Sequence, residues 1–248
     1  MICKSMWRAV FFLDNLIDNG EEQCLPWGWY LQVDFQIFLV CIFILLIYSW
    51  KKKIAVIISS VLMVGSWTYN VIFTQQHKIK LFTSIETLLA FQSYFLNIYI
   101  KPYARWSPYI LGLFLGILYV EYNNQKKIDQ KDSLIVKCLM LKSYLEKHWI
   151  RRRLIEWLGI GLMAFIAFIP RTLQNGGTWP QILDSLYLCF SRMLFNIGII
   201  LVIFPTLLGL KGSFFNTILD TYLFNLVGKI SFCAYLLHYI VVTQMLGV

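Results

Sequence analysis

Four ionisable residues lie within or beside long apolar runs of this sequence, where a charge is costly: Asp34, Arg105, Arg192 and His238. A charged side chain at the centre of a bilayer costs about 2.5–3.5 kcal/mol, so it usually faces a cavity or a partner. A carboxylate or an imidazole can serve as a general base, and an arginine can bind an anionic or carbonyl oxygen. These four residues are therefore the first candidates for a catalytic or ligand-binding site.

Asp34 lies in residues 29–36 (WYLQVDFQ), at the start of an apolar run. At 100° per residue, Tyr30 and Asp34 share one helical face, and we expect Gln36 beside that face. Three roles remain open for Asp34. It is a general base, an ion-pair partner of a buried arginine, or a cap in the first turn of the helix, where acidic residues are favoured.

The other three residues each allow a structural and a functional interpretation. Arg105 lies between two prolines and shortly before Tyr109, which is typical either of an interfacial turn with a snorkelling arginine or of an arginine at the mouth of a cavity. Arg192 lies one-third of the way into an apolar run, so we expect a nearby partner, either a carboxylate such as Asp34 or a substrate phosphate. His238 is either a hydrogen-bonded packing residue or a proton-transfer group.

The composition predicts an all-α, polytopic transmembrane helix bundle. Hydrophobic residues make up 58% of the 248 residues and charged residues 14%, whereas soluble globular chains are about 45–50% apolar and about 25% charged. A soluble enzyme, a disulfide-stapled secreted domain and a disordered chain are therefore excluded. We predict six spans, of which the third and fourth are short: residues 29–50, 54–73, 107–122, 154–169, 185–210 and 230–248.

The basic residues predict an orientation. The net charge is +9, but Lys and Arg gather between the apolar runs, as the positive-inside rule expects, so no nucleic-acid binding is predicted. The side that holds residues 51–53 and the basic loop 123–153 has about twice as many Lys and Arg residues as the other. We therefore predict that loop 123–153 is cytosolic and that segment 1–28 is outer or luminal, in a plasma membrane or endomembrane. Residues 81–100 are predicted to form an interfacial or re-entrant helix.

Glycine spacing predicts close helix contacts, whereas cysteine and histidine spacing predicts no metal site. Gly112 and Gly116 form a G-x-x-x-G in the third span, and Gly159 and Gly161 lie in the fourth. Such small residues let helices approach closely. The three histidines are scattered and no cysteines have a zinc-binding spacing, so we expect no metal and no bound cofactor.

Three segments resemble motifs of the nose-resistant-to-fluoxetine branch of the acyltransferase 3 family. Residues 24–36 (CLPWGWYLQVDFQ) are similar to its W-Y-L-x-x-D-x-Q signature, with an aromatic-rich stretch ending in Asn15 before it. Residues 99–112 (YIKPYARWSPYILG) resemble Y-x-K-P-x-x-R-x-x-P-Y-x-x-G. Residues 228–238 (GKISFCAYLLH) are similar to S-x-x-x-Y-L-x-H. The three matches occur in the family's order and extend over most of the chain.

The resemblance implies an integral-membrane O-acyltransferase, which passes an acyl group from a cytosolic donor, typically acyl-CoA, to a hydroxyl on an acceptor across the membrane. Its expected partners are membrane lipids, the acyl donor and the hydroxylated acceptor. Asp34 and His238 are the catalytic candidates. The expected substrate-binding residues are Trp29, Tyr30, Asp34, Gln36, Arg105, Tyr109 and Arg192.

The sequence departs from that family in one respect. The early-helix histidine and the R-x-x-R of the family, which lie upstream of its W-Y-L motif, have no counterpart here. We therefore expect residues 1–248 to be the C-terminal portion of a longer acyltransferase-like protein. The alternative prediction is a non-catalytic transporter of lipids or small molecules, because a polar-lined path between helices would look the same in sequence.

Overall fold

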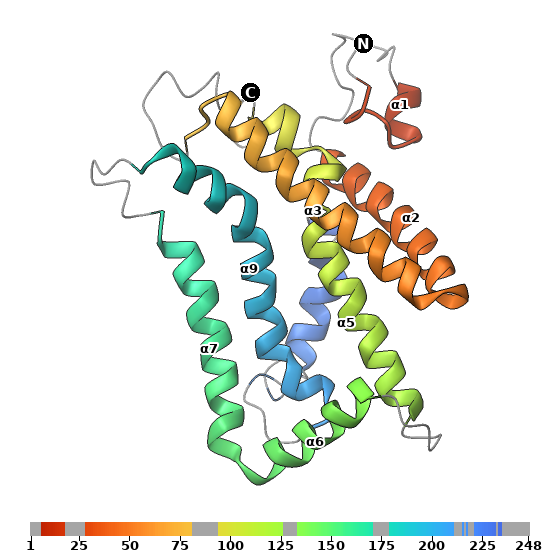
Figure 1. Cartoon of the computed structure of the whole chain (residues 1–248), viewed down its shortest axis with the longest axis vertical. Helices are drawn as coiled ribbons and strands as arrows, with labels where there is room; N and C mark the ends of the chain where they lie inside the picture. Colours follow the sequence, from red (N-terminus) through yellow and green to blue (C-terminus); the bar gives the residue numbers. More distant parts are fainter. Residues whose placement is uncertain are drawn as a thin grey trace.

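The computed structural model describes residues 6–17, 28–80, 94–125, 133–170, 179–210, 215, 217, 221–231 and 233–234. Its α-helices are α1 (Met6–Val10), α2 (Trp29–Trp50), α3 (Lys52–Gln76), α5 (Trp106–Gln125), α6 (Ser133–Lys147), α7 (Trp149–Phe168) and α9 (Gln181–Leu207). A π-helical turn, η2 (Phe95–Tyr99), and a 3-10 turn, η3 (Pro102–Ala104), precede α5. No strand occurs in these ranges, and the predicted all-α bundle is confirmed (Figure 1).

Three helices of the described chain are long and apolar enough to cross a membrane, namely α2, α3 and α9. Helix α2 has the predicted bounds of the first span. Helices α5 and α7 lie where the third and fourth spans are predicted, but α5 ends in polar residues and α7 carries the basic residues 151–153 near its start. Most of the predicted sixth span, 230–248, and of segment 81–100 lies outside the described residues.

Helix α3 shows the reversed polarity expected of a membrane bundle. Its buried residues are small or polar: Ala55, Ser59, Ser66, Asn70 and Thr74. Large apolar side chains of the same helix, such as Ile57 and Val61, are exposed. Small residues at helix interfaces permit close packing in membranes, where outward apolar side chains meet lipid. Helix α3 accordingly packs against α2, α5 and α9.

Helices α7 and α9 make the most extensive contact in the bundle. A Cβ atom added to Gly159 of α7 would lie 2.6 Å from the carbonyl oxygen of Gly198 in α9, so the two backbones touch at this point. The predicted close contact is therefore confirmed for Gly159. It is wrong for Gly112, Gly116 and Gly161, because a Cβ atom at any of these would have no heavy atom within 4 Å.

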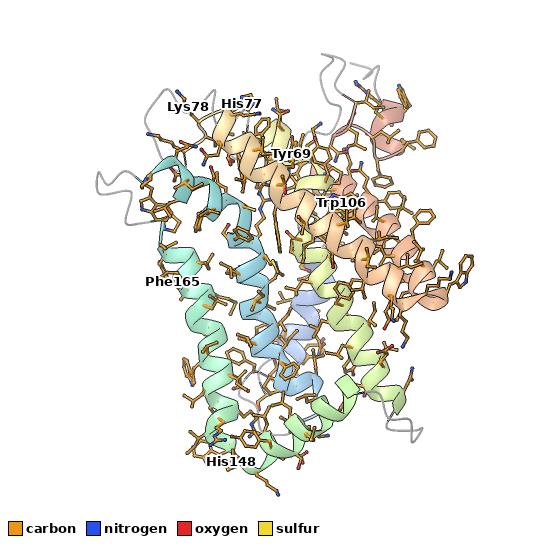
Figure 2. The ribbon with its side chains drawn as sticks, viewed as in Figure 1. Tyr69, His77, Lys78, Trp106, His148 and Phe165 are labelled. Atoms are coloured by element: carbon orange, nitrogen blue, oxygen red, sulfur yellow. The ribbon has the colours of Figure 1, made fainter. Side chains whose placement is uncertain are left out.

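The bundle has two distinct ends. Figure 2 shows His77 and Lys78 at one end and His148 at the other. Helix α6 crosses the His148 end, where Leu145 packs with Tyr122 of α5 and with residues that follow α9 (Figure 1). Lys52, at the start of α3, forms an ion pair with Glu121 near the α6 end of α5. The first turns of α5 and α9 lie toward the opposite end, which we call the His77 end.

Candidate functional site

Asn15 joins three segments that are far apart in the sequence. It is only 1% exposed. Its main-chain N–H donates to Oε1 of Gln32 (3.0 Å), and its side-chain amide donates to the carbonyl oxygen of Ile100 (2.9 Å). The ammonium of Lys101 donates to the carbonyl oxygen of Asn15 (2.5 Å). We call this cluster, which also includes Gln36, the Asn15 junction; its residues come from three segments in or directly beside the family-like motifs.

Gln36 belongs to the Asn15 junction and does not line the cavity described below. Its side-chain amide pairs reciprocally with that of Asn15 (3.1 and 2.8 Å) and donates to the carbonyl oxygen of Phe12 (2.5 Å). Phe12 has a positive φ of 58°, a strained conformation for a bulky residue, which this bond helps to hold. Gln36 lies two positions after Asp34, so the two side chains are about 200° apart around the axis of α2. The expectation that Gln36 lies beside the Asp34 face is therefore wrong, and the helical period of about 100° per residue already places Gln36 on nearly the opposite face.

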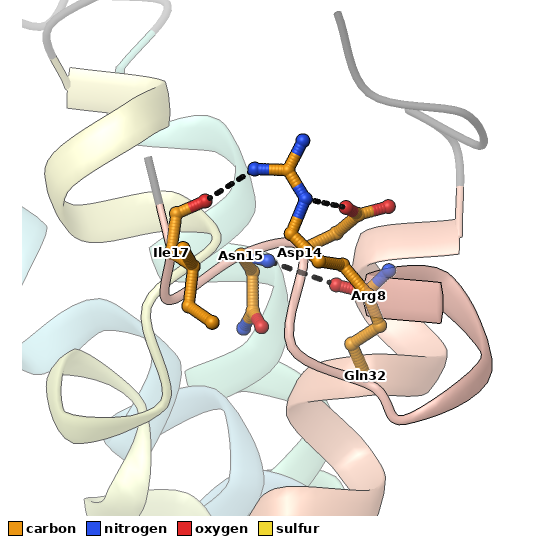
Figure 3. Close-up of polar contacts among 5 residues, drawn as sticks. All are labelled: Arg8, Asp14, Asn15, Ile17 and Gln32. Carbon is orange, nitrogen blue, oxygen red and sulfur yellow. Dashed lines mark hydrogen bonds and ion pairs between the residues drawn. The ribbon is translucent and has the colours of Figure 1, made fainter. Parts of the chain in front are cut away.

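An ion pair lies beside the Asn15 junction (Figure 3). Arg8 Nε is 3.6 Å from an Asp14 carboxylate oxygen, and its guanidinium also donates to the carbonyl oxygen of Ile17 (3.3 Å). Both side chains of the pair are buried. Burial raises the pKa of the Asp14 carboxyl above its ordinary value, against the opposing effects of Arg8 and of a hydrogen bond with Gln32.

Two arginines from distant segments meet around one tyrosine. The guanidinium carbon of Arg105 lies 4.3 Å from the ring centroid of Tyr99 and 4.8 Å from that of Trp29. The guanidinium carbon of Arg192, in α9, lies 5.3 Å from the same Tyr99 centroid. Arg192 also donates to the hydroxyl of Tyr94 (2.9 Å). We call Arg105 and Arg192 the arginine pair.

The arginine pair has no carboxylate partner among the described residues. The predicted pairing of Arg192 with Asp34 is therefore wrong, since the polar partner of Arg192 is Tyr94. The Nε atom of Arg105 is buried and has no hydrogen-bond partner. Burial and the nearby charge of Arg192 lower the pKa of Arg105 from its ordinary value, whereas Tyr99 and Tyr109 raise it.

A cavity of about 850 Å³ opens beside the arginine pair, within the range of about 300–1,000 Å³ that small-molecule sites occupy. It lies between the first turns of α2 and α5, the last turns of α7 and the first half of α9, toward the His77 end. Its lining residues are Tyr30, Arg105, Pro108, Tyr109, Gly112, Ile166, Ala167, Tyr187, Ser191, Arg192, Phe195 and Asn196. The lining therefore combines an apolar wall with two cations and three phenol hydroxyls.

Tyr109 connects the cavity to Asp34. Its hydroxyl lies close enough to Asp34 and to Tyr30 to interact with both side chains. Tyr30 and Tyr109 line the cavity, and Asp34 does not. When the Tyr109 hydroxyl donates to the carboxylate, its oxygen can still accept a hydrogen bond from a hydroxyl group in the cavity. The arrangement can therefore transfer a proton from a bound hydroxyl toward Asp34.

The structure thus brings together most of the predicted site residues. Four of them, Tyr30, Arg105, Tyr109 and Arg192, line the cavity. Trp29 lies against Arg105, and Asp34 stands next to Tyr109. His238 lies outside the described residues. Sequence reasoning did not select as site residues the aromatic and polar residues Tyr94, Tyr99, Tyr187, Ser191, Phe195 and Asn196. Two of them carried a usable signal, because Tyr99 opens the second family-like motif and Asn196 lies one helical turn after Arg192 in the same apolar run.

Comparison with known proteins identifies a family and two relatives. The model of the acyltransferase 3 family, described as an acyltransferase domain, matches residues 4–245. The chain is 27% identical to "Nose resistant to fluoxetine protein 6" of Caenorhabditis elegans over 243 residues, which cover 94% of this chain and 27% of that protein. It is 26% identical to "Regulator of hypoxia-inducible factor 1" of the same organism over 148 residues, 53% of this chain and 30% of that protein. The chain therefore spans less than a third of the length of these curated relatives. No solved structure matches it.

Proposed function

The chain belongs to the acyltransferase 3 family, and from this premise we propose that it forms the acceptor site of an integral-membrane O-acyltransferase. In the proposed reaction, the acceptor hydroxyl attacks the thioester carbonyl of acyl-CoA. A new ester C–O bond forms, the C–S bond breaks, and coenzyme A leaves as its thiol. The hydroxyl proton passes to the Tyr109–Asp34 pair, which hands it on to the departing sulfur.

One observation carries this proposal, namely that Tyr109 interacts with Asp34 and Tyr30 at the edge of a cavity of about 850 Å³ that Tyr30 and Tyr109 line. A general base must lie within hydrogen-bond reach of the proton that it removes. Asp34 meets this requirement through the Tyr109 hydroxyl. The arginines of the lining are suited to steady the negative charge that develops on the carbonyl oxygen during attack.

We further propose that loop 123–153 faces the cytosol and that the cavity takes its acceptor from the outer or luminal side. The basic residues 51–53 begin α3 beside Glu121, and loop 123–153 follows α5 at that same end. The positive-inside rule assigns such an end to the cytosol. The cavity lies toward the opposite end, so the cytosolic acyl-CoA and the acceptor approach from different sides.

The experiment uses the full native product in proteoliposomes and follows coenzyme A release from a radiolabelled acyl-CoA together with labelling of the acceptor lipid fraction. Asp34→Asn should lower turnover by about 10²-fold or more, the usual contribution of a general base. The matched control is Glu121→Gln, which alters a carboxylate at the other end of the bundle and should leave turnover within about twofold. Full turnover in Asp34→Asn would exclude the proposed base.

A second candidate function is transport of a lipid or small molecule without acyl transfer. The observation that favours it is the chemistry of the described lining, in which the ionisable groups are arginines and tyrosines that bind ligands well. The same proteoliposomes distinguish the two functions. Movement of a fluorescent lipid between leaflets with no loss of thioester would support transport, whereas thioester loss that depends on Asp34 would support the enzyme.

A further inference from the structure

We infer that the cavity binds an amphiphile whose oxyanion headgroup is held by the arginine pair, Arg105 and Arg192. This inference rests on the proposed function only in treating the cavity as the acceptor site. It names the chemical class of the acceptor, a molecule with a phosphate-like oxyanion and an apolar body.

The first support is an excess of positive charge inside the bundle. Arg105 and Arg192 are both half-buried, both pack against Tyr99, and neither forms an ion pair within the described part of the chain. Two neighbouring guanidiniums repel each other, and each loses hydration on burial. An anion bound by both guanidiniums would offset the repulsion and part of the lost hydration.

The second support is the way in which the aromatic rings hold the guanidiniums. Trp29 and Tyr99 lie against Arg105, and Tyr99 also lies against Arg192. Such cation–π contacts do not consume the N–H donors of a guanidinium, which remain able to form hydrogen bonds. Arg192 directs one of them to Tyr94, while the buried Nε of Arg105 has no partner. Arginine N–H groups in a planar fork match the oxygens of a phosphate.

The third support is the wall next to the arginine pair. Its members are apolar: Pro108, Gly112, Ile166, Ala167 and Phe195. Gly112 lines the cavity, and a Cβ atom there would have no heavy atom within 4 Å, so this part of the wall leaves room for a ligand. A small inorganic anion would leave this wall in contact with water. An amphiphile would bury it, which is favourable in proportion to the apolar area covered.

The test measures binding of radiolabelled dodecyl phosphate to the full native product in phosphatidylcholine nanodiscs, with no acyl donor present. Partition into protein-free nanodiscs is subtracted. We expect saturable binding that Arg105→Gln and Arg192→Gln each weaken by about tenfold or more, the usual effect of losing a hydrogen bond to a charged group. Arg192→Lys, which keeps the charge and loses the fork, should bind with intermediate affinity.

A pair of glycine variants tests the cavity without altering its charge. Gly112→Leu should weaken binding by about tenfold, because the new side chain fills the space next to the apolar wall. Gly116→Leu is the matched control, since Gly116 lies one turn away on α5, has the same open surroundings and does not line the cavity. It should leave the affinity within about twofold. Thermal unfolding of each variant identifies any protein that has failed to fold.

Three outcomes would overturn the inference. Unchanged affinity in well-folded Arg105→Gln and Arg192→Gln would exclude the arginine pair as the headgroup site. Displacement of the probe by inorganic phosphate at equal concentration would show that the site binds a free oxyanion. Equal displacement by dodecanol would show that the site binds the alkyl chain without recognising the headgroup. Since no acyl donor is present, these outcomes are independent of thioester turnover. Intact binding without turnover would count against the proposed function alone.

Discussion

The Asn15 junction and the arginine pair are two polar clusters in the same half of the bundle, and they differ in how fully their groups are satisfied. In the junction, the side chains of Asn15 and Gln36 donate to and accept from each other and also reach main-chain carbonyl oxygens. In the arginine pair, two cations face a cavity with no carboxylate partner in the described residues.

This difference indicates that the Asn15 junction stabilises the fold, whereas the arginine pair is suited to bind a ligand. A buried polar group is costly to leave unpaired, so a cluster that pairs all its groups internally stabilises the fold and has little capacity left for a ligand. A cluster with surplus donors costs stability and can recover that cost when a ligand binds. Gln36 and Arg105 both lie in the family-like motifs, yet Gln36 is paired within the protein and Arg105 keeps surplus donors.

The strongest test of the junction is Asn15→Ala, which removes the amide that bonds to Gln36 and to the carbonyl oxygen of Ile100. We expect the free energy of unfolding to fall by about 2–4 kcal/mol, because the buried carbonyl oxygen of Ile100 and the half-buried amide of Gln36 lose their hydrogen bonds. Steric trapping in bicelles measures this change. The matched control is Asn225→Ala, which alters an exposed asparagine whose side-chain amide donates to the carbonyl oxygen of Thr221 and should change stability by less than about 0.5 kcal/mol.

The wall of the cavity can be disturbed without touching either cluster. Gly159→Ala places a methyl group 2.6 Å from the carbonyl oxygen of Gly198 and should separate α7 from α9. We expect a loss of about 1–2 kcal/mol, because overpacking outweighs the higher helix propensity of alanine. Gly161→Ala meets open space and should be neutral or slightly stabilising. Equal unfolding midpoints for the two variants would contradict the backbone contact.

Sequence reasoning predicted the fold better than it predicted how polar residues divide between the two clusters. The length of the apolar run correctly predicted the bounds of α2. Helical spacing correctly placed Tyr30 and Asp34 on one face, where both interact with Tyr109. It could not show that Gln36 faces Asn15, because that contact joins segments whose relative positions depend on tertiary packing. The same limit explains why Asp34 was offered as a partner of Arg192, since only the three-dimensional structure shows Tyr109 beside Asp34 and Tyr94 beside Arg192.

The ion pair beside the junction predicts a pH dependence. Burial raises the pKa of Asp14 above its ordinary value of 3.8 in spite of Arg8, so the folded state binds this proton more tightly than the unfolded state. Stability contributed by Asp14 is therefore largest at low pH and falls as the pH rises from about 4 through the pKa of the folded state. Asp14→Asn removes this pH-dependent contribution to the free energy of unfolding. Unfolding midpoints measured across that range should decline more steeply in the wild type than in the variant, and parallel profiles would contradict the raised pKa.

The smallest expected change in stability, from Arg192→Gln, sharpens the contrast between the two clusters most. Removing one partner of a buried ion pair usually costs about 3–5 kcal/mol, because the other charge is left uncompensated. Arg192 has no such partner in the described chain, and its loss also relieves repulsion with Arg105. Glutamine can still donate to Tyr94, so the free energy of unfolding should change by less than about 1 kcal/mol while affinity for dodecyl phosphate falls about tenfold. A loss near 3 kcal/mol would instead place Arg192 with Asn15 among the residues that hold the bundle together, and the surplus charge at the cavity would need another explanation.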